Sequence, residues 1–490
     1  MNLLLVCKGE YRYWLPNLAA ALTERGCTVS AVTFSTPSTR MLDETHQFAE
    51  VHSLAAHLKR WLAQFDEHSV RCLQELDLSG ELGGVLNTMV YADRILRNYD
   101  FETATKMMAG IYDFWATLFT KTRFDAVVGE IASATEWLAC LLARIRSIPY
   151  LVPYPAPLTN RFYFLRSPNG AWESAAKAYE QAKASGLSKK ETQVAEDFLC
   201  AFRANKPKPM LPQLCSRSPL YVDPRRLMKR LGRVPFRFRT YLTDGYLELG
   251  SYDGTPPWSS AAIDARRLVK HMASKLGTFE TKVPRGKQIY FPLHVQPEFT
   301  IDVRAPFSSN QLALVENFAR SIPIGYQLLV KEHPAMRGYR ALGFYRQMKR
   351  LYNVRLLSPS LDSHQLIQNA EVILTIVGTT AWEGILYEKP VIALGPLCYG
   401  FFDLIYPCDD IADFAQIVSE AIRGFKPNRS LVLKFIWALL ASAHEGLWDS
   451  PLRSAQVTER SNIAKLAEAI LSEISTTNTS DSVNALAISQ

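Results

Sequence analysis

Two kinds of feature are absent from this sequence: closely spaced cysteines and long apolar runs. The eight cysteines are scattered, with no Cys-x-x-Cys pair and no histidine at metal-ligand spacing, at positions 7, 27, 72, 140, 200, 215, 398 and 408. This pattern excludes a disulfide scaffold and a zinc motif, and it is typical of a reducing cytoplasm. No apolar run reaches the roughly 18 residues that a membrane-spanning helix needs. The first residues, MNLLLVCKGE, have too short an apolar run for a signal peptide and predict a first β-strand.

The composition is that of a soluble globular protein with more than one domain. The chain has 490 residues, 48% of them hydrophobic and 21% charged, and chains of this length form two or three domains. The net charge of +8 favours an acidic substrate, an anionic membrane surface or nucleic acid, or reflects nothing specific. We find no binding motif around the basic residues and expect no nucleic-acid partner.

The N-terminal region has the alternation of a doubly wound α/β unit. A strand at 2–6, a helix at 15–25, Gly26 and a strand at 28–34 form a βαβ opening. Residues 40–121 predict mostly helix, as an insertion, and the alternation resumes with DAVVG, ATEWLACLLARIR and PYLVPYP. We expect residues 1–280 to form an N-terminal Rossmann-like domain that includes this insertion and a connector.

The connector includes a strongly basic stretch. Residues 170–204 predict two helices, and a proline-rich segment follows them. From Arg225 to Arg239 there are seven basic residues and no acid. The stretch is interpreted either as a solvated, positively charged helix and linker, or as a contact with anionic lipid headgroups or a charged glycan.

A second α/β unit begins near residue 287. Its short apolar strands, QIYFPL, YQLLVKEHP, VRLLS, VILTIV and PVIALG, alternate with helices and predict a parallel sheet. We expect a C-terminal Rossmann-like domain at 281–452, a final helix at 453–474 and a disordered tail at 475–490. The expected fold class is α/β, with two Rossmann-like doubly wound domains that face a cleft.

Polar residues follow three of these strands. The carboxyl ends of parallel strands form the ligand crevice of such a sheet. One loop carries His294, Gln296 and Glu298, and the next carries Lys331 and His333. We expect the first three to bind substrate, and Lys331 and His333 to face a phosphate. Each histidine taken alone is also consistent with an ordinary loop or core residue.

The third loop joins VILTIV to a short helix. Gly378, Thr379 and Thr380 form a strand-to-helix turn whose amides suit an anion, and one of the threonines is expected to cap the helix. Glu383 lies one turn into the helix, where it would accept hydrogen bonds from a ribose. These four residues are therefore predicted to bind a nucleotide, although many strand–glycine–helix turns bind nothing.

The segments YFPLHVQPEF, LLVKEHPAMRGYR and ILTIVGTTAWEGILYEKPVIALG, in this order, resemble the capsular polysaccharide biosynthesis family, which contains bacterial Kdo transferases. RFYFLRSPNGAWE also resembles a segment of that family. The resemblance implies a GT-B fold, in which the domain at 1–280 is on the acceptor side and the domain at 281–452 binds the nucleotide sugar. It also implies transfer of Kdo, or a related acidic sugar, from CMP-Kdo to a glycan or glycolipid, with retention (β-linkage) and without a metal ion or other cofactor. It also implies a cytoplasmic enzyme, peripheral to the inner membrane if the basic stretch binds lipid.

Retention requires a carboxylate or a tightly held ion pair near the anomeric carbon. Glu130, at the end of the DAVVG strand, is the first catalytic candidate, and Glu10, after the first strand, is the second. Arg161 is a candidate for a substrate carboxylate. All three are equally consistent with ordinary loop charges. The acidic-Asp-Gly-Phe stretch of bifunctional family members is absent from the sequence, so the resemblance assigns no nucleophile.

Two other functions fit the sequence. One is a UDP-sugar epimerase of the same two-domain shape, which would leave the basic stretch unexplained. The other is a non-catalytic factor for capsule assembly or export with a vestigial nucleotide site, which would bind no nucleotide.

Overall fold

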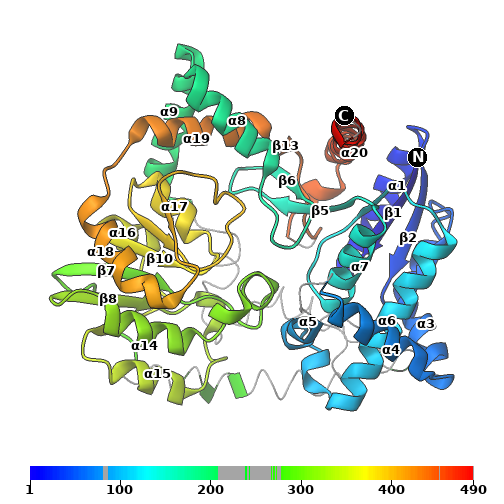
Figure 1. The fold of residues 1–490 in the computed structure, drawn as a ribbon, viewed down its shortest axis with the longest axis horizontal. Coiled ribbons are helices and arrows are strands. Elements are labelled where there is room, and N and C mark those ends of the chain that lie inside the picture. Colours follow the sequence, from blue (N-terminus) through cyan, green and yellow to red (C-terminus); the bar gives the residue numbers. More distant parts are fainter. Residues whose placement is uncertain are drawn as a thin grey trace. The chain divides into compact units, whose positions relative to one another are not determined.

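The computed structural model describes residues 1–80, 86–207, 278–451 and 453–488, with a few isolated residues between 208 and 277. The described chain divides into two compact units. Unit 1 contains Met1–Gly170 and Ala443–Gln490, and unit 2 contains 171–207 and 278–442. The expected boundary at 280/281 therefore differs from the observed division. Helices expected in the N-terminal domain belong to unit 2, and the C-terminal helix belongs to unit 1 (Figure 1).

The sheet of unit 1 has the strand order β13-β6-β5-β4-β1-β2-β3. Its strands are β1 (Asn2–Cys7), β2 (Thr28–Thr33), β3 (Val51–Ser53), β4 (Ala126–Val128), β5 (Tyr150–Pro155), β6 (Arg161–Leu165) and β13 (His444–Glu445). The first five strands along the chain are parallel, and β6 and β13 add an antiparallel edge. The sequence pattern missed β3, β6 and β13. β3 and β13 are edge strands of three and two residues, which are too short to show apolar alternation.

Helices cover both faces of this sheet. They are α1 (Leu15–Thr23), α2 (Thr36–Asp43), α3 (Leu54–Ala63), α4 (Glu67–Leu78), α5 (Leu86–Ala92), α6 (Phe101–Lys121), α7 (Ala134–Ile145) and α20 (Arg460–Ile488), with 3-10 turns η1 (Gly9–Tyr13), η2 (Leu96–Asn98) and η6 (Ala455–Thr458). α20 packs on α1 and buries Leu466 and Ile470 in the core of unit 1. This burial explains why the last helix belongs to the first unit. α20 extends to Ile488, and the expected disorder of residues 475–490 stays a prediction.

The sheet of unit 2 has the order β12-β11-β10-β7-β8-β9. Its strands are β7 (Lys287–Pro292), β8 (Tyr326–Lys331), β9 (Val354–Leu357), β10 (Val372–Thr375), β11 (Val391–Ala393) and β12 (Ile405–Pro407). All five pairings are parallel. Numbered along the chain this is the Rossmann order 3-2-1-4-5-6. The expected fold class of two Rossmann-like domains is confirmed by the topology of the two sheets.

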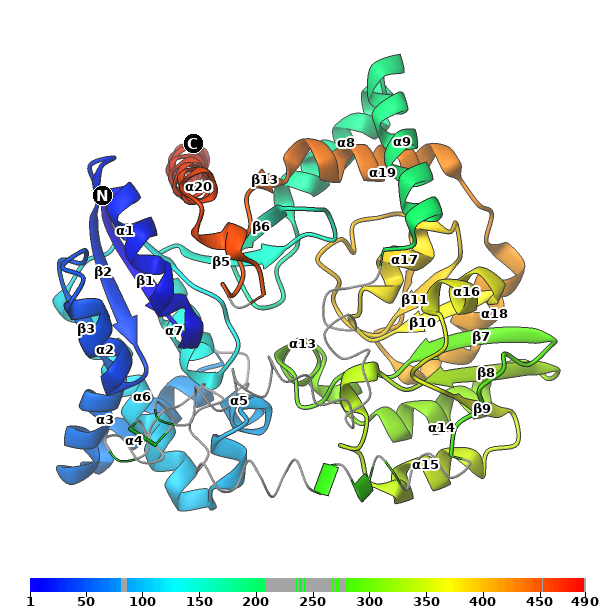
Figure 2. The same ribbon diagram turned by 180° about the vertical axis from the view of Figure 1, so that it is seen from behind.

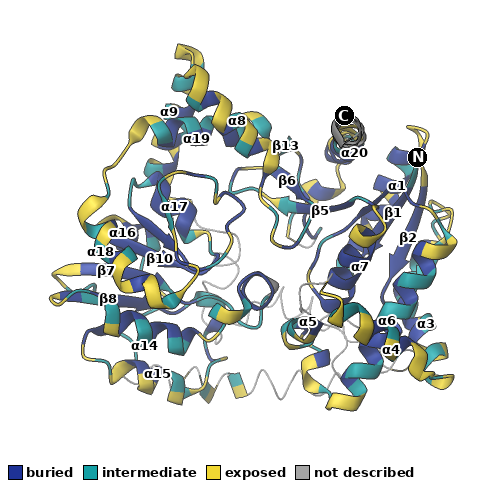
Figure 3. Cartoon of the chain, in the orientation of Figure 1, coloured by how far each residue is buried: buried dark blue, intermediate teal, exposed yellow. Residues whose placement is uncertain are grey.

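The helices of unit 2 are α8 (Glu173–Ser185), α9 (Lys189–Asn205), α13 (Phe299–Asp302), α14 (Gln311–Ser321), α15 (Leu342–Lys349), α16 (Ser363–Asn369), α17 (Thr380–Leu386), α18 (Phe414–Gly424) and α19 (Arg429–Ser442), with 3-10 turns η3 (Pro306–Ser308), η4 (Pro334–Met336) and η5 (Ile411–Asp413). α19 packs against α8 and α9, and α16 and α17 lie next to each other on the sheet (Figure 2). The central strands are buried (Figure 3), as expected for a sheet covered on both faces.

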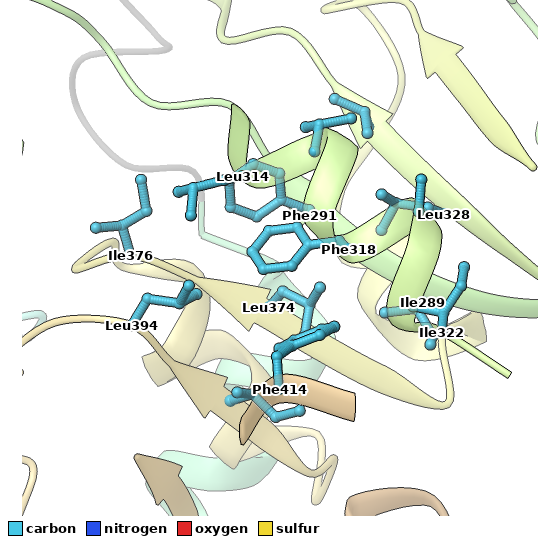
Figure 4. Packing of buried hydrophobic residues seen from close by; sticks show 14 of the residues in the cluster. Ile289, Phe291, Leu314, Phe318, Ile322, Leu328, Leu374, Ile376, Leu394 and Phe414 are labelled. Carbon is cyan, nitrogen blue, oxygen red and sulfur yellow. The ribbon is translucent and has the colours of Figure 1, made fainter. Parts of the chain in front are cut away.

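One apolar cluster fixes the strands that carry the candidate site. Alternate residues of β7, Ile289 and Phe291, point into it together with Leu374 of β10. Phe318 of α14 and Phe414 of α18 lie in the same cluster with ring centroids 4.6 Å apart (Figure 4). Burying each such side chain contributes roughly 1.5–3 kcal/mol. The neighbours β7 and β10 are therefore held rigidly, and the loops at their carboxyl ends start from fixed positions.

Candidate functional site

The candidate site of unit 2 lies where the strand order reverses, between β7 and β10. In sheets of this order, ligands bind outside the carboxyl ends of the strands at the reversal. The loops after β7 and β10 begin there, and β8 pairs with β7 on the other side. This parallel pairing confirms the expectation that the three polar loops start from one edge of the sheet.

The β10–α17 turn is narrow. The amide of Gly378 donates to Oγ1 of Thr375 over 3.0 Å, and the same oxygen lies 3.3 Å from Nε2 of His294. A β-carbon at Gly378 would lie 2.7 Å from this nitrogen. Glycine is therefore required by the close approach of the two loops.

The amides at the start of α17 remain available to a ligand. The main-chain N–H groups of Thr379 and Thr380 have no acceptor among the described residues. Thr379 is the N-cap residue, but its side chain makes no capping hydrogen bond. The expected capping by a threonine hydroxyl is therefore wrong, because Thr379 already has helical φ and ψ, and a capping hydroxyl needs an extended backbone.

Glu383 is a buried carboxyl group one turn into α17. Its residue is 6% exposed, and no described residue donates a hydrogen bond to it. Burial raises the pKa of this carboxyl to about 8, Lys331 lowers it, and Asp362 raises it. A buried acid of this kind is costly unless it is protonated or receives hydrogen bonds. It is suited to accept hydrogen bonds from ligand hydroxyls.

Lys331 is the last residue of β8 and is also buried. Its Nζ donates to Oγ of Ser363, at the start of α16, over 2.5 Å. The Tyr290 hydroxyl also interacts with Ser363, and the charges of Glu383 and Asp362 act on it. The sequence analysis missed Ser363 and Tyr290. The alternation of side chains along β7 could have identified Tyr290, because this residue lies on the opposite face of the strand from Ile289 and Phe291.

Both candidate histidines are neutral at physiological pH. Burial and the charges of His333 and Arg340 lower the pKa of His294 to about 3. Burial and the charges of Lys331 and Arg340 lower that of His333 to about 4. Nδ1 of His333 accepts from the amide of Ala335, so its proton is on Nε2, as a hydrogen-bond donor.

A buried ion pair supports these loops. Arg340 Nε donates to Glu332 over 3.0 Å, and the Tyr345 hydroxyl donates to the same carboxylate over 2.7 Å. Arg340 also donates to the main-chain carbonyl of His294. Glu332 and Arg340 therefore join the β7 and β8 loops and act as supports.

Gln296 and Glu298 lie in the loop after β7, where their contacts are internal. Gln296 donates to Asp302 and to the carbonyl of Ser309, and it accepts from Gln311. The main-chain amide of Glu298 donates to Asp302. These bonds shape the loop, and the expected binding of substrate by these two side chains stays a prediction.

The two catalytic candidates lie at the carboxyl edge of the other sheet, in unit 1. Glu130 follows β4 and accepts a hydrogen bond from the hydroxyl of Tyr11. Burial raises its pKa, while Tyr11 and Lys8 lower it. Glu10 accepts a hydrogen bond from Ser450. The sequence analysis missed Tyr11, although its position in the loop after β1 was a usable signal.

Arg161 begins β6, away from the strand reversal of its sheet. It forms an ion pair of 3.3 Å with Glu445 and donates to the carbonyl of Ala443, so it links β6 to β13. Its expected contact with a substrate carboxylate stays a prediction.

Three further features were considered in the sequence: the basic stretch, membrane-spanning helices and metal ligands. Apart from Pro235, Phe238 and Arg239, the basic stretch Arg225 to Arg239 lies outside the described residues. Within the described chain, no helix has the length and apolar character needed to cross a membrane. Over the same residues, no three His, Cys, Asp or Glu side chains are grouped to hold a metal ion.

A segment in the second half of the chain is similar to a known family. Residues 259–406 match the family model described as capsule polysaccharide biosynthesis protein, which confirms the resemblance for this segment. Protein FixF of Sinorhizobium fredii is 28% identical over 155 residues, which cover 30% of this chain and 37% of FixF.

Among solved structures, the β-Kdo 2,4-transferase of Thermosulfurimonas dismutans KpsC is similar over 66% of this chain and 82% of its own, with a TM-score of 0.37 and 15% identity. The UDP-GlcNAc 2-epimerase of Neisseria meningitidis is similar over 96% of this chain and 100% of its own, with a TM-score of 0.23 and 12% identity. The fold assignment rests on the chain's own sheet topology.

Proposed function

We propose that this protein is a glycosyltransferase of capsule or surface polysaccharide synthesis that takes a CMP-activated acidic sugar, with CMP-Kdo as the expected donor. The observation that carries the proposal is the carboxyl of Glu383, which is buried beside Lys331 and receives no hydrogen bond from a described residue, at the strand reversal of a Rossmann-like sheet. The family match over residues 259–406 supports the polysaccharide class.

Each part of the site has a role in this proposal. The amides of Thr379 and Thr380 and the Nε2–H of His333 bind the phosphate as donors. Lys331 supplies the positive charge that the phosphate needs and that helps the leaving nucleotide depart. Glu383 accepts hydrogen bonds from the ribose hydroxyls. Gly378 keeps the turn narrow enough for His294 to lie against it.

For the carboxylate of the sugar-transfer step, we propose Glu130 ahead of Glu10. Glu130 has a raised pKa and one hydroxyl donor, whereas Glu10 is bonded to Ser450. Retention, β-linkage and a glycan or glycolipid acceptor are parts of the proposal that come from the family resemblance. From its sequence alone, the basic stretch Arg225 to Arg239 supports a cytoplasmic protein that binds an anionic inner-membrane surface.

The test is incubation of the purified protein with CMP-Kdo and detection of released CMP. Release by the wild-type protein that falls by at least about tenfold in Lys331→Met supports the proposal. Release of UDP from a UDP-sugar, or interconversion of UDP-sugars without CMP-Kdo turnover, would point to a different donor or to an epimerase. Lys282→Met, which changes an exposed lysine, is the matched control.

A further inference from the structure

The amino-terminal edge of the unit 2 sheet, opposite the candidate site, carries a group of exposed basic side chains. Strands β7, β8 and β9 are neighbours in the sheet, so the turns before them lie next to one another at this edge, where the starts of β7 and β8 are exposed (Figure 3). Seven exposed basic residues of the described chain lie in these segments or at the helix ends that lead into them: Arg285, Lys287, Arg320, Arg346, Lys349, Arg350 and Arg355. We call this surface the basic edge.

The acids close to the basic edge are fewer, and two of them are already engaged. Glu280 forms an ion pair of 3.5 Å with Arg355, and Glu371, before β10, accepts a hydrogen bond from the Tyr326 hydroxyl over 2.6 Å. Glu316, on α14, is the third acid. Three arginines of the basic edge form no ion pair with a described residue: Arg285, Arg320 and Arg350. The surface therefore keeps a net positive charge.

Helix ends account for only part of this charge. Arg320 is in the last turn of α14 and Lys349 in the last turn of α15, where cations interact favourably with the helix dipole. Arg346 and Arg350, however, are four residues apart on α15, and like charges at this spacing destabilise a helix slightly. Arg285 precedes a strand and has no helix end to neutralise. An anionic partner would explain the charges that the fold itself does not use.

Ile324 projects from the turn before β8 and is 93% exposed. The amide of Tyr326 donates to the carbonyl of Pro323 over 3.2 Å, which closes a turn with Ile324 at its second position. Gly325 has a φ of +87°, as the third position of a type II turn requires. The tight turn therefore holds the isoleucine side chain out in solvent.

Tyr352 has the equivalent position in the turn before β9, which is closed by a main-chain hydrogen bond of 3.2 Å, and it is 85% exposed. The side-chain amide of the next residue, Asn353, is buried and donates to the carbonyl of Ala319 over 2.7 Å. This bond ties the turn to the end of α14, where Arg320 lies. Ile324 and Tyr352 therefore project from two neighbouring turns, among the cations.

This combination matches the surface of an anionic lipid bilayer. Arginine and lysine bind headgroup phosphates, while exposed aliphatic and tyrosine side chains enter the boundary between headgroups and acyl chains. A soluble polyanion would use the cations but would gain little from Ile324. We propose that the basic edge is a membrane-binding surface, with its cations on anionic headgroups and with Ile324 and Tyr352 inserted between them.

The inference goes beyond the proposed function, because it assigns a membrane contact to unit 2 that is separate from the stretch Arg225 to Arg239 and requires no sugar donor. The basic edge and the candidate nucleotide site lie at opposite ends of the same strands. β7 has six residues, so the two sites are separated by about 20 Å, at about 3.3 Å per residue. Binding of vesicles should therefore leave the affinity for CMP unchanged.

The first experiment measures binding of the full chain to vesicles by co-sedimentation. Vesicles of phosphatidylcholine mixed with phosphatidylglycerol should bind the protein, and vesicles of phosphatidylcholine alone should not. Arg285→Gln combined with Arg350→Gln should lower the affinity by about 20-fold, since each cation near an anionic surface contributes about fivefold. Arg25→Gln combined with Arg40→Gln, which removes two exposed arginines of unit 1, should retain the affinity. No binding to the anionic vesicles, or equal losses in the two double variants, would overturn the proposal.

The second experiment separates a bilayer from a soluble polyanion. Ile324→Ser should weaken vesicle binding by about tenfold, because an inserted isoleucine is removed from water, and it should leave binding to dextran sulfate unchanged. Phe307→Ser replaces a fully exposed residue of η3, after β7, and should bind vesicles as the wild type does. Thermal unfolding should be unaltered in both variants, because neither side chain is buried. Vesicle binding that survives Ile324→Ser would identify a site for polyanions and overturn the membrane assignment.

Two further measurements separate this proposal from the proposed function. Neutralising the stretch Arg225 to Arg239 should leave the additional loss caused by Arg285→Gln with Arg350→Gln intact. If neutralising the stretch abolishes vesicle binding while the double variant binds as the wild type does, the contact belongs to the stretch and the proposal fails. Vesicle binding through the basic edge by a protein that binds no CMP would contradict the proposed function and support the membrane surface.

Discussion

A β-carbon at Gly378 would lie 2.7 Å from Nε2 of His294, so the loops after β10 and β7 meet in a contact that only glycine permits. Gly378→Ala should displace the imidazole and the turn, because overpacking costs about 1–3 kcal/mol. We expect lower stability in denaturant unfolding and weaker CMP binding. Gly343→Ala, at a site in α15 with open space around the added carbon, should leave CMP binding unchanged and should not lower stability, because alanine favours the helix. If Gly378→Ala binds CMP normally, this turn does not hold the phosphate.

Lys331 should contribute directly to phosphate binding. Its ammonium group is buried beside Glu383 and Ser363, and a charge-assisted hydrogen bond contributes about 1.5–3 kcal/mol. Calorimetry should show CMP affinity falling by about tenfold to 100-fold in Lys331→Met. Lys282→Met, which replaces an exposed lysine, should bind CMP as the wild type does. Equal losses of CMP affinity in both variants would indicate only a general effect of the protein's charge.

Glu383 should make stability depend on pH. The pKa of this carboxyl is raised to about 8 in the fold, above the roughly 4.3 of an unfolded glutamate. Its contribution to stability is therefore fully present below about pH 4 and is lost as the pH rises toward 8. Glu383→Gln should remove this loss, so its advantage over the wild type should grow between pH 5 and 8.

The measurement is thermal unfolding across that range, with Glu420→Gln, on the exposed face of α18, as the control. His294 and His333 have lowered pKa values and are common to all three proteins, so their effects cancel in the comparison. A constant difference between Glu383→Gln and the wild type would contradict the raised pKa.

Arg340 and Glu332 should stabilise the loops as a pair. Removing one partner of a buried ion pair costs about 3–5 kcal/mol, so Arg340→Met should lower the free energy of unfolding by about that amount. The double variant Arg340→Met with Glu332→Leu should recover much of the loss. Arg355→Met, which breaks an exposed pair with Glu280, should cost about 1 kcal/mol or less. A double variant no better than the single one would reject the pairing.

The sequence predicted the second sheet better than the contacts inside its loops. Strands such as VILT are apolar on both faces, and this pattern identifies a buried parallel strand without reference to the rest of the chain. Gln296 was predicted to bind substrate, yet its partners Asp302 and Gln311 come from later helices. No local pattern indicates which polar side chain will be used to shape its own loop.

The contact between Tyr11 and Glu130 in unit 1 could not be predicted from the sequence for a related reason. Tyr11 and Glu130 are hydrogen-bonded but are separated by a long helical insertion in the sequence. Their approach depends on the pairing of β1 with β4, a contact that strand patterns alone do not assign. The sequence analysis identified Glu130 because this residue follows a predicted strand, but it did not identify Tyr11.

The central claim is that the carboxyl edge of the unit 2 sheet binds a cytidine nucleotide through Glu383. Calorimetric titration of CMP, CDP, UMP and UDP into the wild-type protein, Glu383→Gln and Glu420→Gln tests it directly. We predict selective CMP binding that weakens by at least about tenfold in Glu383→Gln and is unchanged in Glu420→Gln. Preference for UDP, equal CMP binding by Glu383→Gln, or the absence of any nucleotide binding would contradict it.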